Sequence, residues 1–252
     1  MKMMERILRL DTVDSTNNVL KNLAEQGAEE GQIVVAEEQS AGKGRRGRSF
    51  SSPKGKGIYF SYLLRPEELD ASVSTLTPRA AVAVARTIQK VCGICPQIKW
   101  VNDLVIHGKK VCGILTEMTM EEGKIRHVIL GIGINVNQEA EDFPEELAEI
   151  ATSLSIEVGR TFSREQLIEE LVKELDAMWV GEETMDAEYL EEYQRRCVTI
   201  GKDVCVISGS SRRKARAIQV NEDYSLQVEY EEGERENLNS GEVSVRGVEG
   251  YV

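Results

Sequence analysis

The sequence IKWVNDLVIHGKKVCGILTEMTMEEGKIRHVILGIGINV spans residues 98–136 and carries most of the information about the fold. Its apolar runs occupy 98–101, 104–106, 111–118 and 125–134, and turn residues such as His107-Gly108 and Glu122-Gly123 separate the later ones. Short runs rich in Val and Ile between turns are typical of β-strands, and turns this short connect antiparallel neighbours. The segment therefore predicts consecutive antiparallel strands of one sheet.

Further strands and several helices are expected on both sides of this segment. Upstream, strands are predicted at 7–10, 32–37 and 58–64. A helix is predicted to follow Asp14-Ser15-Thr16-Asn17 and to end at Gly27. A core helix is predicted to start at Thr77-Pro78 and to end at Cys92. Downstream, Ser163-Arg164-Glu165-Gln166 predicts a capping box for a helix through Met178, and a shorter helix ends near Arg196.

The character of the sequence changes after residue 198. Short apolar runs at 204–207, 214–220, 226–230 and 243–245 are separated by Gly, Asn, Asp and Ser. The whole pattern predicts an α+β fold, in which a central mixed or antiparallel sheet with flanking helices occupies residues 1–198. A small C-terminal β-barrel domain is expected over residues 199–252.

Charge and hydropathy exclude some classes of function. The 252 residues carry a net charge of −12, which disfavours a general nucleic-acid binder because the chain as a whole would repel a polyanion. No apolar run is long enough for a membrane span, and Met1 to Leu10 lacks the features of a secretory signal. We therefore expect a cytoplasmic protein with no membrane partner.

Cysteine and histidine are too sparse to suggest a site. The five cysteines are expected to be reduced thiols, and Cys92 and Cys95, which could form a redox pair, are interpreted as two small buried residues where a helix ends. His107 and His127 are the only histidines, so a mechanism built on a histidine base has little to work with.

A basic, glycine-rich loop stands out in this acidic chain. Between Gln39 and Pro66 there is no acidic residue, while the cations are Lys43, Arg45, Arg46, Arg48, Lys54, Lys56 and Arg65. Glycines at 42, 44, 47, 55 and 57 let backbone N–H groups approach an anion closely. The loop lacks the Gly-Lys-Ser/Thr of a P-loop and the glycine spacing of a dinucleotide fingerprint. Composition alone leaves three interpretations open: a phosphate-ligand loop, a solvated basic loop or a nucleic-acid contact.

The order of several motifs is more specific. These are Asp14-Ser15-Thr16-Asn17, the stretch from Gln39 to Arg48, Lys99-Trp100-Val101-Asn102-Asp103-Leu104, the stretch from Gly108 to Leu115, Gly131-Ile132-Gly133-Ile134-Asn135-Val136-Asn137, and Gly241-Glu242-Val243-Ser244-Val245-Arg246. In this order they resemble the motifs of biotin protein ligases and cover almost the whole chain. Two positions depart from the family's pattern: Lys43 stands where the family commonly has Arg, and Val101 where it commonly has Pro. Lys43 keeps the charge but loses the bidentate fork of Arg.

The resemblance implies a class II synthetase-like fold and an activity. Biotin and ATP would react to biotinyl-5'-AMP and pyrophosphate, with Mg²⁺ present, and the biotinyl group would pass to a lysine of a biotin carboxyl carrier domain. This is the reaction of a biotin–[acetyl-CoA-carboxylase] ligase. Because the first motif begins at Asp14, we expect the catalytic form without a preceding DNA-binding domain and no DNA partner. An edge strand of the open sheet could serve for homodimerisation or for acceptor docking, and we expect a homodimer.

The resemblance also implies site residues. Lys99 and Arg45 are expected to be catalytic, and replacing Lys99 with Ala is expected to abolish adenylation. Biotin is expected to contact Ser15, Thr16, Asn17, Gln39, Gly42, Lys43, Gly44, Arg45, Lys99, Gly131 and Gly133. The nucleotide is expected to contact Arg45, Arg48, Lys99, Trp100 and Asn102, with Arg246 reaching it from the C-terminal domain. Residues 42–57 are expected to form a lid that excludes water from the adenylate.

Other interpretations of these residues remain open at this stage. Ser15 and Thr16 could cap a helix, Trp100 could be a core residue, Lys99 could face solvent, and Gly131 and Gly133 could mark a β-bulge. A lipoate protein ligase would share the fold and the acyl-adenylate chemistry. A non-enzymatic anion or nucleic-acid binding module would use the same basic loop.

Overall fold

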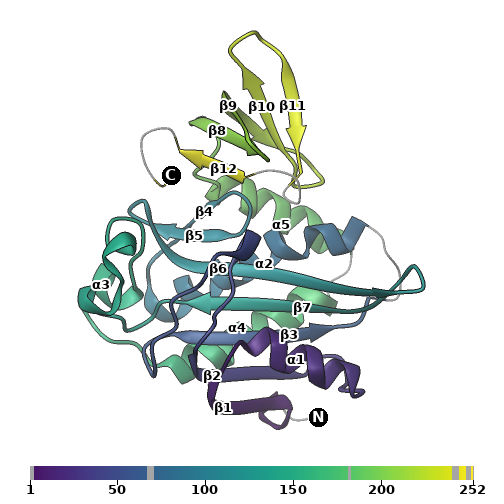
Figure 1. The fold of residues 1–252 in the computed structure, drawn as a ribbon, viewed down its shortest axis with the longest axis vertical. Coiled ribbons are helices and arrows are strands. Elements are labelled where there is room, and N and C mark those ends of the chain that lie inside the picture. Colours follow the sequence, from purple (N-terminus) through teal and green to yellow (C-terminus); the bar gives the residue numbers. More distant parts are fainter. Residues whose placement is uncertain (1–2, 67–70, 181–182, 240–243, 248–250, 252) are drawn as a thin grey trace.

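A computed structural model describes residues 3–66, 71–180, 183–239, 244–247 and 251, and its larger part is a seven-stranded mixed sheet (Figure 1). The strands are β1 (Ile7–Val13), β2 (Ile33–Gln39), β3 (Ile58–Leu64), β4 (Gln97–Lys99), β5 (Asp103–Ile106), β6 (Lys109–Glu121) and β7 (Lys124–Ile134), in the order β1-β2-β3-β7-β6-β5-β4. The β1–β2 pair is parallel and the other pairs are antiparallel. The predicted run of antiparallel strands over 98–136 is confirmed.

Helices cover both faces of this sheet. They are α1 (Thr16–Glu25), α2 (Ala71–Cys92), α3 (Leu154–Val158), α4 (Arg164–Val180) and α5 (Glu183–Arg196), with short 3-10 turns at Met3–Arg6, Arg45–Gly47, Ala140–Asp142 and Glu145–Leu147. On one face, Leu20 of α1 packs against Val34 and Leu63. On the other face, the alternate side chains of the strands, such as that of Val35, pack with α2 and α4 in the main core. The central strand β3 is therefore buried along its whole length.

The predicted start of α2 at Thr77-Pro78 is wrong. The helix already begins at Ala71 and contains Pro78. Leu76 is fully buried and Val73 packs against the core, so residues before the proline have an apolar surface to bury. This tertiary packing outweighs the local preference of proline for a helix start.

The C-terminal part is a five-stranded antiparallel sheet. Its strands are β8 (Asp203–Ser208), β9 (Ser211–Val220), β10 (Leu226–Tyr230), β11 (Arg235–Leu238) and β12 (Ser244–Gly247), in the order β11-β10-β9-β8-β12. The sequence interpretation missed β11, because in Arg235–Leu238 only Leu238 is apolar and buried. Within the described residues, β11 and β12 are unpaired edges of an open sheet. The boundary between residues 198 and 199 stays a prediction.

The two sheets share one hydrophobic core. The indole N–H of Trp100 donates to the Tyr224 carbonyl oxygen at 2.9 Å, and the rings of Tyr193 and Tyr224 meet edge to face at 5.3 Å. The backbone N–H of Val198 donates to the Ile98 carbonyl oxygen. Figure 1 shows the C-terminal sheet beside β4 and β5, far from β1. The interface between the sheets therefore lies at the β4 end of the large sheet.

All five cysteines are free thiols, as predicted, but they are not equally buried. Cys92 is buried at the end of α2, whereas Cys95 is exposed, so the interpretation of both as buried residues is wrong for Cys95. Gly93 has φ +76°, which turns the chain out of the helix and toward the surface before Cys95 is reached. Among the helices that the structure describes, none is long and apolar enough to cross a membrane.

Candidate functional site

Two adjoining cavities gather most of the predicted site residues. The first is lined by Ser15, Thr16, Asn17, Gln39, Lys43, Gly44, Arg45, Gly131 and Gly133 from the predicted biotin contacts. The second is lined by Arg45, Arg48, Lys99, Trp100, Asn102 and Arg246 from the predicted nucleotide contacts. Gly44, Arg45, Phe50, Asn102 and Lys110 line both cavities. The two groups of residues therefore meet along one shared wall.

The first cavity has a hydrogen-bonded polar end at the start of α1. The side-chain oxygen of Gln39 accepts from the Thr16 N–H at 2.9 Å and the Thr16 hydroxyl at 3.1 Å, and Nε2 of Gln39 donates to Ser52 at 3.0 Å. Ser61 Oγ lies 2.8 Å from Thr16 Oγ1 and 2.6 Å from Asn17 Oδ1. Thr16 and Asn17 are buried. The polar groups are thus fixed in direction before any ligand arrives.

Ser15 precedes α1 without capping it. Its backbone is extended, and its side chain makes no capping hydrogen bond. The capping interpretation is therefore wrong for Ser15, whose buried side chain lines the cavity instead.

The glycines of β7 make room for protein groups. A Cβ at Gly131 would lie 2.3 Å from Asn17 Oδ1, and one at Gly133 would lie 2.6 Å from the Phe50 ring. The pairing of β7 with β3 and β6 is regular at both positions, so the β-bulge interpretation is wrong. Phe50, which the sequence interpretation did not select, thus covers β7 beside the cavity. Only its place next to the Gly-rich loop pointed to it.

Lys43 makes its contacts across the first cavity. Its ammonium donates to Asn18 Oδ1 at 2.6 Å and lies 3.5 Å from Glu117 Oε1. The other oxygen of Glu117 accepts from Asn17 at 2.6 Å. At this departure from the family's pattern, Lys43 links the loop to α1 and β6.

Gly42 lines neither cavity. Its carbonyl oxygen accepts from the Phe50 N–H at 2.8 Å, and a Cβ would lie 2.4 Å from the Phe50 carbonyl oxygen. The residue lets the two arms of the loop approach each other. Gly42 therefore supports the backbone of the loop and does not line a cavity.

The shared wall holds two cations. Nη1 of Arg45 donates to Asn102 Oδ1 at 2.9 Å. Lys110 Nζ lies 2.6 Å from Asp103 Oδ1. The sequence interpretation missed Lys110, because it treated Gly108-Lys109-Lys110 as a turn and gave no weight to one lysine of the motif. Its position on both cavities makes it a better candidate than Lys99 to contact two ligands at once.

Lys99 lines the second cavity and not the first. The structure therefore does not support its predicted contact with biotin, because the other predicted biotin contacts lie around the first cavity. Its side chain is buried rather than facing solvent, and its ammonium lies 3.6 Å from the centre of the Tyr251 ring. Burial lowers the pKa of Lys99 to about 8. Trp100 is 5% exposed and is both a core residue and a part of the cavity wall.

The second cavity is strongly electropositive. Its cations are Arg45, Arg46, Arg48, Lys99, Lys110 and Arg246, and Asp103 is the carboxylate among the described lining residues. Burial alone would raise the pKa of Asp103, but the Lys110 ammonium and hydrogen bonds from Lys110 and Tyr251 hold it below its ordinary value. One negative charge therefore faces six positive ones in a chain whose net charge is −12. The cavity suits a polyanion such as a nucleoside triphosphate.

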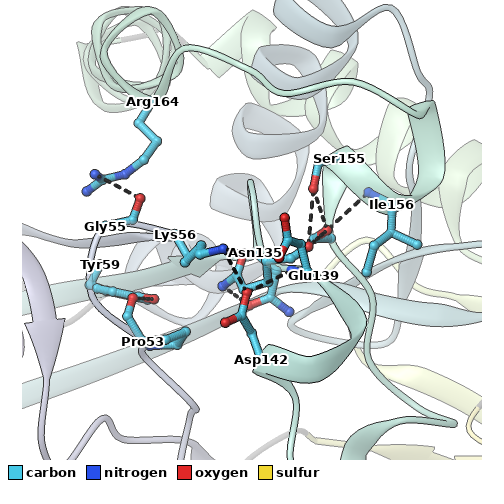
Figure 2. Close-up of polar contacts among 12 residues, drawn as sticks. Pro53, Gly55, Lys56, Tyr59, Asn135, Glu139, Asp142, Ser155, Ile156 and Arg164 are labelled. Atoms are coloured by element: carbon cyan, nitrogen blue, oxygen red, sulfur yellow. Dashed lines mark hydrogen bonds and ion pairs between the residues drawn. The ribbon is translucent and has the colours of Figure 1, made fainter.

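The later part of the basic segment, from Pro53 to Lys56, makes polar contacts with residues that line neither cavity (Figure 2). The Lys56 ammonium lies 3.2 Å from Asp142 and 3.7 Å from Glu139, and Arg164 donates to the Gly55 carbonyl oxygen at 3.3 Å. The Tyr59 hydroxyl donates to the Pro53 carbonyl oxygen at 2.8 Å.

Two further cations of the segment also make contacts elsewhere. Lys54 pairs with Asp11 at 2.7 Å, and Arg65 donates to carbonyl oxygens at the end of α1, including those of Ala24 and Ala28. Of the seven cations in this segment, only those from Lys43 to Arg48 therefore line the cavities, and Lys54, Lys56 and Arg65 do not.

Magnesium does not fit a protein-held site in the second cavity. No group of three or more His, Cys, Asp or Glu side chains lies together among the described residues. Both oxygens of Asp103 accept hydrogen bonds, from Lys110 and Tyr251 respectively. The donor set offers cations where a divalent metal needs oxygen ligands.

Comparison with known proteins agrees with this arrangement. Residues 10–135 match the model of the biotin/lipoate A/B protein ligase family. The chain is 46% identical over 168 residues to the bifunctional ligase/repressor BirA of Bacillus spizizenii, which covers 67% of this chain and 52% of the relative. The chain thus spans about half the length of that relative.

Two other proteins match over more of their length. The biotin–[acetyl-CoA-carboxylase] ligase of Mycobacterium tuberculosis is 31% identical over 198 residues, which are 76% of this chain and 71% of that protein. The solved structure of the biotin protein ligase from Aquifex aeolicus in complex with biotin and ATP superposes with a TM-score of 0.82 at 29% identity. It covers 96% of this chain and 98% of the other. The family match, these relatives and the shared fold show that this chain belongs to the biotin/lipoate A/B protein ligase family.

Proposed function

We propose that this protein activates biotin with ATP and transfers the biotinyl group to a lysine of a biotin carboxyl carrier domain. The observation that carries the proposal is the shared wall of the two cavities. There Arg45 and Lys110 stand between the first cavity, whose far end carries hydroxyl and amide groups, and the strongly cationic second cavity. The Aquifex aeolicus protein of the same fold was solved with biotin and ATP, which supports this assignment of the two chambers.

The polar end of the first cavity suits a cyclic urea. The ureido ring of biotin offers one carbonyl and two N–H groups, which would be costly to bury without partners. Ser15, Thr16, Asn17 and Gln39 supply hydroxyl and amide groups at this end. The dithiolane ring of lipoate has no group to satisfy them, so the same pocket disfavours lipoate.

The first chemical step joins two anions. A carboxylate oxygen of biotin attacks the α-phosphorus of ATP, the bond to the bridging oxygen breaks, and pyrophosphate leaves. Arg45 and Lys110 lower the repulsion between carboxylate and phosphate, and both act from fixed positions because Asn102 and Asp103 hold them. Lys99, Arg48 and Arg246 bind the phosphates from the second cavity.

The second step consumes the mixed anhydride. The neutral ε-amine of the acceptor lysine attacks the acyl carbon, the bond to the phosphate oxygen breaks, and AMP leaves with both electrons of that bond. The attacking nitrogen releases one proton to solvent and becomes the amide nitrogen. Water must be kept out between the two steps, and residues 43–50 lie where a lid would do so. Magnesium, which the described residues do not hold, would accompany the phosphates of ATP.

The test is ATP–pyrophosphate exchange measured with biotin, with lipoate and with neither. We expect exchange with biotin alone. Exchange with lipoate but not biotin would assign the other branch of the family. Salt-sensitive oligonucleotide binding without any exchange would favour a binding module. Homodimerisation stays a prediction, which sedimentation with and without ligands would check.

A further inference from the structure

Tyr251 reaches the second cavity from the C-terminal part of the chain. Its ring centre lies 3.6 Å from Lys99 Nζ, and its hydroxyl donates to Asp103 Oδ2 at 2.5 Å. Neither the quoted motifs nor the proposed reaction uses this residue. We propose that Tyr251 is a positioning residue of the nucleotide cavity, which holds Lys99 and the Asp103–Lys110 pair in place for the phosphates of ATP. The inference rests on the proposed function for the identity of the nucleotide.

The hydroxyl of Tyr251 completes the hydrogen bonding of Asp103. Oδ1 of Asp103 accepts from Lys110 at 2.6 Å and from Asn102 at 3.1 Å, and Tyr251 is the donor to Oδ2 among the described residues. Burial and the adjacent carboxylate raise the pKa of Tyr251, so the hydroxyl stays protonated and donates. Without the Tyr251 hydroxyl, the Asp103 carboxylate could rotate toward another cation. Lys110, which is paired with that carboxylate, would then move away from the shared wall.

The ring of Tyr251 stabilises Lys99 without neutralising it. The Lys99 ammonium is buried in a cavity that holds Asp103 and several other cations. A direct ion pair with a carboxylate would cancel the charge that a phosphate needs. An aromatic face instead offers attraction to a desolvated ammonium and leaves its charge available. The ring therefore fits a cation that must stay ready for an incoming anion.

The position of Tyr251 also couples the two parts of the chain. Tyr251 follows β12, and Arg246 of that strand lines the same cavity. Lys99 and Asp103 belong to β4 and β5 of the large sheet. The contact therefore closes one side of the cavity with residues that lie far apart in the sequence.

The test compares Tyr251→Phe, which keeps the ring, with Tyr251→Ala, which removes both contacts. Tyr230→Phe is the matched control, because it removes a tyrosine hydroxyl that bonds to Glu236 elsewhere in the C-terminal sheet. In biotin-dependent exchange, we expect Tyr251→Ala to raise KM for ATP by about tenfold. Tyr251→Phe should lower kcat about threefold through Lys110 while KM for ATP changes little. KM for biotin should stay unchanged in all three variants.

A lowered KM for ATP in Tyr251→Ala would show that Tyr251 blocks the second cavity. If Tyr251 blocked the cavity and had to leave before ATP entered, Tyr251→Ala would lower KM for ATP. A lowered or unchanged KM for ATP in folded Tyr251→Ala overturns the proposal, and so does an unchanged kcat in Tyr251→Phe. Thermal unfolding of each variant shows whether the fold is retained, and Tyr251→Phe keeps the test valid if Tyr251→Ala unfolds.

A second measurement needs no ATP and no activity. The rate at which acetic anhydride labels Lys99 is followed against pH by peptide mass spectrometry, and the plateau at high pH reports access to the neutral amine. We expect a several-fold higher plateau in Tyr251→Ala and an unchanged one in Tyr251→Phe. Equal plateaus in wild type and Tyr251→Ala would overturn the ring contact. If the wild-type protein showed no biotin-dependent exchange, the proposed function would be overturned, whereas the labelling result would still test the contact between Tyr251 and Lys99.

Discussion

The guanidinium of Arg45 donates to the side-chain oxygen of Asn102 at 2.9 Å, at the point where the two cavities meet. Asn102 is itself fixed, because its amide donates to the Ile114 carbonyl oxygen at 2.9 Å. A residue of the turn between β4 and β5 thus holds the one loop arginine that both cavities share. The charge of Arg45 therefore has a defined place on the shared wall.

Replacing Arg45 with Ala is expected to lower the rate of biotin-dependent exchange by about 100-fold or more, since a fixed cation facing the developing charge is lost. Asn102→Ala should lower it about tenfold, because Arg45 keeps its charge but loses its anchor. Arg195→Ala is the control, since Arg195 is an exposed arginine on α5. Equal rates for Arg45→Ala and Arg195→Ala would contradict the assignment.

Lys110 offers a second test with a neighbour as its control. Lys110→Met should lower kcat for adenylation about 100-fold, because the shared wall loses the cation that faces both ligands. Lys109→Met should leave kcat unchanged, since Lys109 donates to the Ala148 carbonyl oxygen and lines neither cavity. The role of Lys110 is wrong if both variants exchange at the wild-type rate.

The pH dependence of ATP use should report Lys99. Because burial lowers its pKa to about 8, the ammonium is charged below that value and loses its charge as the pH rises through it. KM for ATP should rise about tenfold over the two pH units around this value. Lys99→Arg should abolish this rise, because a guanidinium stays charged. The groups around Lys99 are Arg48, Asp103, Lys110, Arg246 and Tyr251. A rise retained in Lys99→Arg would show that another group titrates.

Amide hydrogen exchange should divide the basic loop in two. Residues 43–50 are expected to gain protection when biotinyl-AMP binds, whereas Gly55 and Lys56 should already be protected without it. The reason is that Gly55 N–H donates to the Glu37 carbonyl oxygen and Lys56 N–H donates to the Pro53 carbonyl oxygen. This narrows the lid predicted over 42–57. Equal protection of residues 43–50 in both states would rule out the lid.

Gly131→Ala should weaken biotin binding and leave ATP binding unchanged. The added Cβ would lie 2.3 Å from Asn17 Oδ1 and would displace the side chain that also contacts Ser61 and Glu117. We expect Kd for biotin to rise about tenfold or more in calorimetry. Gly123→Ala, in the turn between β6 and β7, is the control for a glycine change outside the cavities. Unchanged biotin affinity in Gly131→Ala would remove Asn17 from the binding site.

The sequence predicted those parts of the fold that depend on local patterns. The limits of β3 were predicted to the residue, because Ile58–Leu64 is apolar except for Ser61 and lies between loops. The start of α2 and the strand β11 were not, since packing of Leu76 and pairing with β10 are tertiary effects.

The candidate site divides in the same way. Residues in ordered motifs, such as Thr16 and Gln39, could be selected from the sequence, and they line the first cavity. Tyr251 could not be, because its hydroxyl meets a carboxylate 148 positions away and no pattern joins them. Phe50 and Lys110 stand inside recognisable segments, but only the three-dimensional structure shows which side chain of each segment turns toward a cavity.

The hydrogen bond from Trp100 to the Tyr224 carbonyl oxygen has a consequence for folding. Because the two sheets share one buried cluster, the C-terminal sheet has no separate core that could melt by itself. Heat or denaturant should therefore unfold both parts in one cooperative transition. Trp100 also lines the second cavity, so its fluorescence would report loss of that wall in the same transition. The second cavity would then lose its shape in the same step in which the protein loses its global stability.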